Sequence, residues 1–251
     1  MLDLSLSSRP DKFNIYLKIL ENILRNNKST IKQFAVLLFN VEAGWWRMHY
    51  SSNNDFNIGS FLEYADKLNL VGATDLAQAF REAVRPAWND NLSNEEKSYF
   101  LLSDGDISWG ENNLYQLSAL LNKKDRVYAF NTGISGTDLR VLSHFCRQTN
   151  GAMFTVLNED EVEKAAAAIQ KESWTIQSIK SDGLNDILIA GRPQQVFSGQ
   201  QLQISGRGKL TSGSYFDLQL TNGEKEKNLR ITINDIIAFD PGHQGLWSGC
   251  C

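Results

Sequence analysis

Apolar residues recur along the first two thirds of the chain in two alternating patterns. Continuous apolar runs at 34–39, 99–102, 127–130 and 153–156 are typical of strands that are buried on both faces. Apolar positions three or four residues apart indicate amphipathic helices between those runs, over 10–26, 76–84, 114–121, 139–146 and 162–169. Strands that alternate with such helices form βαβ units. We therefore expect an α/β fold with a Rossmann-like, doubly wound, mostly parallel sheet covered by helices on both faces.

One pair of strands departs from this pattern. Only Glu42-Ala43-Gly44 and a few neighbours separate the run at 34–39 from an aromatic segment at 45–50. A connection this short suits a hairpin, whereas two parallel strands need a crossover of about a dozen residues or more. The sequence therefore predicts an antiparallel strand at the edge of the sheet.

Near residue 172 the apolar period changes from that of a helix to the two-residue period of a strand. Apolar and polar residues alternate around 202–204, 216–220 and 229–233, and glycines at 206–208 and 221–223 predict turns between these segments. We expect a domain at 1–171 and a small antiparallel β-sandwich-like module at 172–251. No low-complexity linker separates the two, so the module is expected to pack against the first domain.

Composition narrows the possible functions. The 251 residues are 42% hydrophobic and carry a net charge of −4, with both signs mixed along the chain. Nucleic-acid and anionic-membrane binding need a basic stripe, which is absent from the sequence. No apolar run approaches the ~20 residues of a membrane-spanning helix. The three cysteines, Cys146 and the pair Cys250-Cys251, lack the spacing of a zinc site.

Small oxygen-bearing side chains occur at three places that the predicted topology brings to one sheet edge. Asp3, Ser5 and Ser7 follow the first strand, Thr74 opens a predicted helix 67 residues later, and Asp104 follows the 99–102 strand after a further 30 residues. Ligands of open α/β sheets bind beyond the carboxyl ends of the strands, where the strand order reverses. Carboxylate and hydroxyl oxygens suit a hard divalent cation.

Each of these residues also has a purely structural interpretation. Ser7 is suited to cap the first helix, Thr74 is a favoured N-cap residue, and Asp104-Gly105 is a common turn. Taken singly, these interpretations are favoured for Thr74 and Asp104. The ordered placement of all five residues on three loops at one edge favours a metal site.

Three segments resemble the metal-ion-dependent adhesion site of von Willebrand factor type A domains: the Asp3-x-Ser5-x-Ser7 loop, Gly72-Ala73-Thr74-Asp75-Leu76 and Leu101-Leu102-Ser103-Asp104-Gly105. The resemblance covers about residues 1–171, and the segment 127–151 is similar to the second half of that family. It implies that Ser5, Ser7 and Thr74 are ligands of Mg²⁺ or Mn²⁺ and that Asp3 and Asp104 act largely through water. Leu6 stands where the family commonly has glycine, so the loop backbone is expected to differ there.

A second resemblance concerns the β module. Gly191-Arg192-Pro193 and the segment 197–202 are similar to the region that follows the A domain in inter-alpha-trypsin-inhibitor heavy-chain-like proteins.

These resemblances imply a non-enzymatic, cation-dependent adhesion module that binds an Asp or Glu carboxylate of a protein partner. The alternative is an intracellular scaffold or regulatory subunit of an ATPase or chelatase-type complex. Mg²⁺-assisted phosphoryl hydrolysis ranks last, because Ser5 stands where an Asp-x-Asp nucleophile pair would need its second carboxylate.

Only two residues precede Asp3, fewer than a buried strand needs, so we expect the module to be part of a larger protein. The compartment stays open, and the resemblance favours the cell envelope or the extracellular space.

Overall fold

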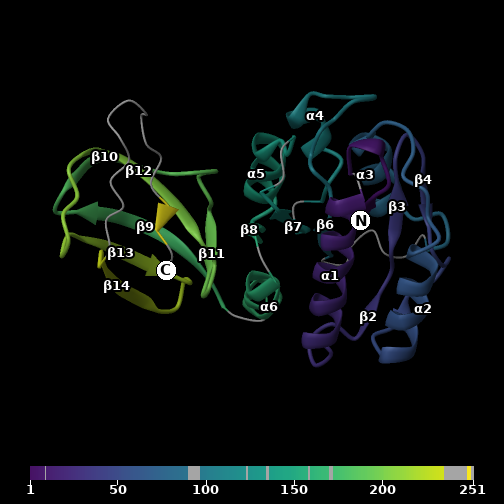
Figure 1. Ribbon diagram of the computed structural model, residues 1–251, viewed down its shortest axis with the longest axis horizontal. Helices are drawn as coiled ribbons and strands as arrows, with labels where there is room; N and C mark the ends of the chain where they lie inside the picture. The colour runs from purple at the N-terminus through teal and green to yellow at the C-terminus, as the bar shows by residue number, and fades with distance from the viewer. Residues whose placement is uncertain are drawn as a thin grey trace.

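The computed structural model describes residues 1–8, 10–89, 97–122, 124–133, 136–157, 159–169, 172–234 and 248–249. Its N-terminal part is built on one twisted sheet in the order β4-β3-β1-β6-β7-β8 (Figure 1). The strands are β1 (Leu2–Asp3), β3 (Leu37–Phe39), β4 (Ala43–Trp45), β6 (Ser98–Leu101), β7 (Arg126–Asn131) and β8 (Ala152–Thr155). All neighbouring strands are parallel except β3 and β4, which are antiparallel. The predicted sheet with an antiparallel edge strand is therefore confirmed.

The centre of this sheet is the contact between β1 and β6. The backbone N–H of Asp3 donates to the Leu102 carbonyl at 3.0 Å, and the N–H of Leu102 donates to the Met1 carbonyl at 2.9 Å. From β1 the chain proceeds to β3 on one side and later to β6 on the other. The strand order therefore reverses at β1, and the ends of β1 and β6 flank the reversal point.

Helices cover both faces of the sheet. One apolar core lies under α1, α2 and α6, and a second lies under α3, α4 and α5. The helices are α1 (Pro10–Asn26), α2 (Asp55–Ala65), α3 (Leu76–Val84), α4 (Leu114–Ser118), α5 (Leu139–Gln148) and α6 (Glu159–Ala168). Helix α1 buries Tyr16, Ile19 and Ile23, which recur at helical spacing on the face toward the sheet.

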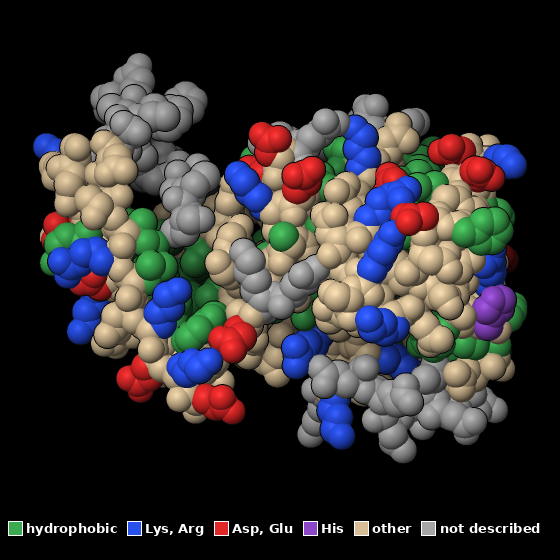
Figure 2. Space-filling model, turned by 90° about the horizontal axis from the view of Figure 1, so that it is seen from below, with side chains coloured by type: hydrophobic (Ala, Val, Ile, Leu, Met, Phe, Trp, Pro, Cys, Tyr) green, Lys and Arg blue, Asp and Glu red, His purple; other side chains and the backbone are tan. Residues whose placement is uncertain are grey.

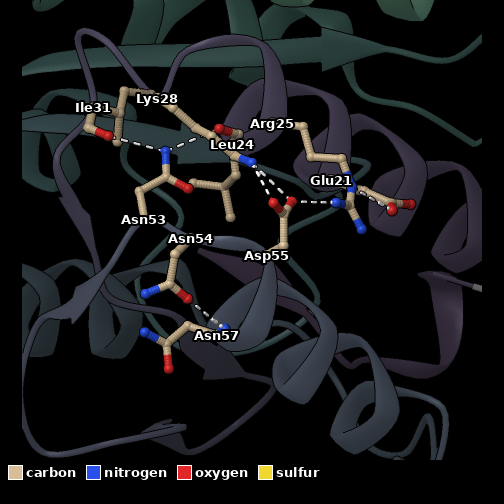
Figure 3. Close-up of polar contacts among 9 residues, drawn as sticks. All are labelled: Glu21, Leu24, Arg25, Lys28, Ile31, Asn53, Asn54, Asp55 and Asn57. Atoms are coloured by element: carbon tan, nitrogen blue, oxygen red, sulfur yellow. Dashed lines mark hydrogen bonds and ion pairs between the residues drawn. The ribbon is translucent and has the colours of Figure 1, made fainter.

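Helix α2 is an element that the sequence analysis did not predict. The Asn54 side chain caps it by accepting from the backbone N–H of Asn57 at 2.9 Å, and Ile58 and Phe61 are buried. Its first residue, Asp55, binds Arg25 in the last turn of α1 and Lys28 in the turn that follows (Figure 3). A cap and an ion-pair cluster therefore fix the start of α2 against the preceding helix.

The strands before α2 are shorter than predicted. The run expected as one strand at 34–39 is divided into β2 (Gln33–Phe34) and β3, and the strand expected at 45–50 is β4, which ends at Trp45. The ring of Trp46 packs against Phe34 and Phe61, with centroids 6.3 and 5.3 Å apart. The Trp46 ring thus packs toward the core, while the Trp46 N–H still donates to the Val36 carbonyl at 2.9 Å. Beyond Trp46, β5 (Ser51–Ser52) pairs with β2.

The C-terminal part consists of two antiparallel sheets around a separate apolar cluster. Their orders are β11-β9-β13-β14 and β10-β12-β15. The strands are β9 (Ser173–Ser181), β10 (Leu184–Ile189), β11 (Gln195–Phe197), β12 (Leu202–Gly208), β13 (Tyr215–Thr221), β14 (Glu226–Thr232) and β15 (Ser248–Gly249). The predicted antiparallel region is confirmed.

One predicted turn in this region is wrong. Residues 206–208 belong to β12, whereas the turn predicted at 221–223 does connect β13 to β14. A Cβ on Gly208 would lie only 2.1 Å from the Gly183 carbonyl oxygen, and Gly208 has a φ of +145°. The glycine is therefore explained by the close approach of the end of β12 to the backbone that connects β9 to β10.

Contacts join the two parts at β11 and β8 (Figure 1). Phe197 of β11 lies in the core under α1 and α6, and Gln200 Nε2 donates to the Met153 carbonyl at 2.8 Å. The predicted boundary between residues 171 and 172 falls next to 170–171, which lie outside the described residues. We propose the division into two domains on the separate apolar clusters of the two parts.

Candidate metal centre

Three loops meet at the carboxyl ends of β1 and β6. The first, 3–8, is bonded to the second, 71–75, because the Leu6 N–H donates to the Gly72 carbonyl at 3.0 Å. The second is bonded to the third, 103–109, because the Trp109 N–H donates to the Thr74 carbonyl at 3.1 Å. Each of the five residues predicted as ligands lies on one of these loops.

Asp3 ends β1 and joins the first loop to the third. Its Oδ1 accepts from the Ser5 N–H at 2.8 Å, and its Oδ2 accepts from the Ser103 hydroxyl at 2.6 Å. The hydroxyls of Ser5 and Ser7 lie 3.0 Å apart. Asp3 and Ser5 are buried and Ser7 is half-buried, so the loop presents a row of oxygens that runs outward from the sheet.

Burial raises the pKa of Asp3 to about 6. The hydrogen bonds from Ser103 and Ser5 lower the pKa, while the nearby charge of Asp104 raises it further. Two carboxylates in one buried site repel each other, and an adjacent cation would relieve that repulsion. The electrostatics of Asp3 are therefore those of a site that favours positive charge.

Asp104 is fully buried, and both of its carboxylate oxygens are engaged. Oδ1 accepts from the Asp106 N–H at 3.1 Å, and Oδ2 accepts from the Lys12 ammonium at 2.9 Å. Gly105 has a φ of +75°, and the Asp104 side chain accepts from the N–H two residues further on, as aspartate side chains often do at chain reversals. Lys12 was not considered in the sequence analysis. One feature of the sequence could have indicated that Lys12 is buried: it lies one helical turn before the buried Tyr16, on the same face of α1.

Thr74 is not the cap of the helix that follows it. Asp75 caps α3, because its Oδ1 accepts from the Gln78 N–H at 3.0 Å. The Thr74 N–H donates to the Ser108 hydroxyl at 3.0 Å, but its own Oγ1 is buried and has no hydrogen-bond partner in the part of the chain that the structure describes. An unpartnered buried hydroxyl costs stability of the order of 1–3 kcal/mol. The Thr74 hydroxyl oxygen is thus available to coordinate a bound group.

The donor set fits a hard divalent cation in its chemistry, with two carboxylates and three hydroxyls. Within the described ranges, no group of three or more His, Cys, Asp or Glu side chains is arranged to hold a metal. A site here would therefore depend on the hydroxyls of Ser5, Ser7 and Thr74. Lys12 is a competing cation at the same place.

The rim of the site is apolar. Each loop carries one large exposed side chain: Leu6 is 69% exposed, Val71 54% and Trp109 63%. An open groove of about 830 Å³ runs from Leu6 and Ser7 along α1 to Leu70. On the face of the molecule shown in Figure 2, basic and acidic side chains are interspersed.

Comparisons with known proteins agree with this architecture. The sequence profile of the von Willebrand factor type A domain matches residues 1–168. No curated protein sequence matches the chain. A von Willebrand factor type A protein from Catenulispora acidiphila has a TM-score of 0.52 at 14% identity, over 93% of this chain and 65% of that one.

Two further solved structures are similar. An aerotolerance-related membrane protein from Bacteroides fragilis has a TM-score of 0.50 at 13% identity, over 67% of this chain and 94% of that one. The pilus adhesin SpaC from Lactobacillus rhamnosus GG has a TM-score of 0.52 at 10% identity, over 91% of this chain and 42% of that one. At these identities the likeness concerns the fold alone.

Proposed function

Because the chain belongs to the von Willebrand factor type A family, whose domains typically mediate protein–protein interaction without catalysis, we propose that it binds a protein partner through a divalent cation. Asp3, Ser5, Ser7, Thr74 and Asp104 would hold Mg²⁺ or Mn²⁺. The cation, when bound, would supply positive charge for an Asp or Glu carboxylate of the partner.

The observation that carries this proposal is the buried hydroxyl of Thr74, which has no hydrogen-bond partner among the described residues and lies on a loop bonded to the loops of two buried carboxylates. Asp75 performs the capping that would otherwise account for Thr74. The three loops that supply the oxygens are bonded to one another and lie where the strand order reverses, which is the usual ligand position of open α/β sheets.

The apolar rim supports a protein as the partner. Leu6, Val71 and Trp109 are exposed around the polar centre, and interfaces combine a polar contact with surrounding apolar side chains that exclude water. The partner would present its carboxylate between apolar residues.

The site is tested by thermal unfolding with millimolar Mg²⁺ or Mn²⁺ against EDTA, on the wild type and on Thr74→Val. A ligand at about 100 times its Kd stabilises the folded state by about 2.7 kcal/mol, so the wild-type melting temperature should rise by several degrees. Thr74→Val should lose most of that rise, because valine keeps the shape of threonine and removes the oxygen.

Thr132→Val is the control, since Thr132 is also a buried threonine but its hydroxyl lies against Tyr16 and it is not one of the five predicted ligands. It should keep the metal-dependent rise. Equal rises in Thr74→Val and the wild type would refute Thr74 as a ligand, and no rise in the wild type would count against the metal. Asp104→Ala is less informative, because it leaves the buried Lys12 ammonium without its counter-charge.

For the setting of the module we propose the cell envelope or the extracellular space, as part of a larger protein. Two of the similar structures are described as a membrane protein and a pilus adhesin. None of the helices in the described part of the chain has the length and apolar content needed to cross a bilayer. The role of an ATPase-complex subunit gains no support from the matches reported above.

A further inference from the structure

We propose that Lys12 is a built-in competitor for the cation of the proposed site. Its ammonium occupies Asp104 in place of a metal and must leave that oxygen before a divalent cation is held there. Lys12 would thereby set the metal affinity of the module. The inference rests on the proposed function and concerns how strongly the site is filled.

The contact itself is unusual for this molecule. Lys12 is only 2% exposed, and its Nζ lies 2.9 Å from Asp104 Oδ2. Of the ion pairs between described residues, this is the one in which both side chains are buried. Lys12 belongs to α1 and Asp104 follows β6, so the pair joins a helix to the loop of another strand.

The Lys12 ammonium and a metal ion compete for the Asp104 carboxylate. A cation held by Asp104, directly or through water, would lie within a few ångströms of the ammonium. Like charges at such separations repel strongly away from bulk water. The ammonium also supplies the positive charge that a buried carboxylate needs, so Asp104 is compensated without any metal. Binding of the cation must therefore displace Lys12.

The surroundings of Lys12 give the displaced side chain a way out. A Cβ placed on Gly136 would lie 3.8 Å from Lys12 Nζ, and Gly136 is exposed. The ammonium thus lies just beneath the surface, beside a residue without a side chain. A long flexible lysine at this position reaches solvent by rotating its own bonds, without a shift of α1.

The test is a titration with Mn²⁺, followed by the electron paramagnetic resonance signal of the free ion, on the wild type, Lys12→Met and Lys18→Met. Lys18 is an exposed lysine of the same helix and serves as the matched control. Lys12→Met should bind Mn²⁺ at least about tenfold more tightly than the wild type, which corresponds to about 1.4 kcal/mol. Lys18→Met should bind like the wild type.

Lys12→Gln gives a second neutral variant that can still donate to Asp104, and circular dichroism checks that each variant is folded. Adding Thr74→Val to Lys12→Met should abolish the tight binding, which assigns it to this site. Binding by Lys12→Met but not by the wild type would also support the inference. Equal or weaker binding by the folded Lys12 variants than by a binding wild type would overturn it and leave the proposed function standing. No binding by any variant would overturn both.

Discussion

Thr74 and Asp75 are neighbours that divide two tasks between them. Asp75 caps α3, while the Thr74 hydroxyl takes no part in the helix. Both residue types are good N-caps, so their order along the chain does not say which one performs the capping. The three-dimensional start of the helix settles the question, and Thr74 remains available to the site.

His144 allows a prediction on pH. Burial lowers its pKa, the charge of Arg147 lowers it further, and a hydrogen bond to the Leu114 carbonyl opposes both. The unfolded chain, with an ordinary histidine pKa of about 6.5, therefore binds more protons than the folded protein in mildly acidic solution. The contribution of neutral His144 to the free energy of unfolding is present above pH 6.5. It is lost as the pH falls toward the lowered pKa of this histidine.

We expect the unfolding free energy to fall less between pH 8 and pH 5.5 in His144→Gln than in the wild type. Urea denaturation at both pH values measures the difference. His49→Gln, which changes an exposed histidine, should follow the wild-type profile. A His144→Gln profile that matches the wild type would show that the buried imidazole titrates as it does in the unfolded chain.

The candidate site was only partly predictable at this scale. The spacing of Asp3, Thr74 and Asp104 predicted three loops at one sheet edge, and backbone hydrogen bonds join those loops. The role of these residues as ligands stays a prediction. The partner of Asp104 was not foreseen, because Lys12 is 92 residues away and a lysine near a helix start is ordinarily solvated.

At the scale of elements, long periodic segments were predictable and short or irregular ones were not. Helix α1 was predicted because its apolar residues repeat over four turns. Helix α2 was missed, because Gly59 and two phenylalanines weaken its helix propensity and only Ile58, Phe61 and Ala65 mark its buried face. Its Asn54 cap was the one local signal. Strand β4 was placed too late because the inward packing of Trp46 is a tertiary contact.

Asn53 fixes the passage from α1 to α2. Its Nδ2 donates to the carbonyls of Leu24 and Ile31, each at 2.9 Å (Figure 3). Asn53→Ala leaves both carbonyls without this donor, so the unfolding free energy should fall by about 1–3 kcal/mol. Chemical denaturation measures the loss.

Asn22→Ala is the control for this change, since Asn22 donates to a single solvent-accessible carbonyl of α1. Its effect should stay within about 0.5 kcal/mol. Similar losses in the two variants would mean that the double contact of Asn53 contributes nothing specific.

At the scale of the whole molecule, Phe197 joins the C-terminal sheets to the α/β part. Its ring lies 6.0 Å from that of Tyr128 and 5.9 Å from that of Phe154, between centroids. Phe197 therefore belongs to the core of the α/β part, although its strand is in the C-terminal part. The sequence predicted that the two parts pack together, but nothing in its period singled out residue 197.

Phe197→Ala should lower the unfolding free energy by about 3–5 kcal/mol, as for other buried phenylalanines. We also expect calorimetry to resolve two transitions in place of one, because the two apolar clusters lose a shared side chain. Phe56→Ala, at an exposed phenylalanine of α2, should change neither quantity appreciably. A single unshifted transition in Phe197→Ala would show that the parts are held together by other contacts.

The wide separation of the three loops along the chain has a consequence for biosynthesis. Asp3 and Ser103 are 100 residues apart, so the ribosome delivers the second about 5–20 s after the first. Until then the first loop has no partner at β6, and no shorter nascent chain can gather the oxygens into one place. The proposed site would thus be assembled in a single step, when β6 pairs with β1.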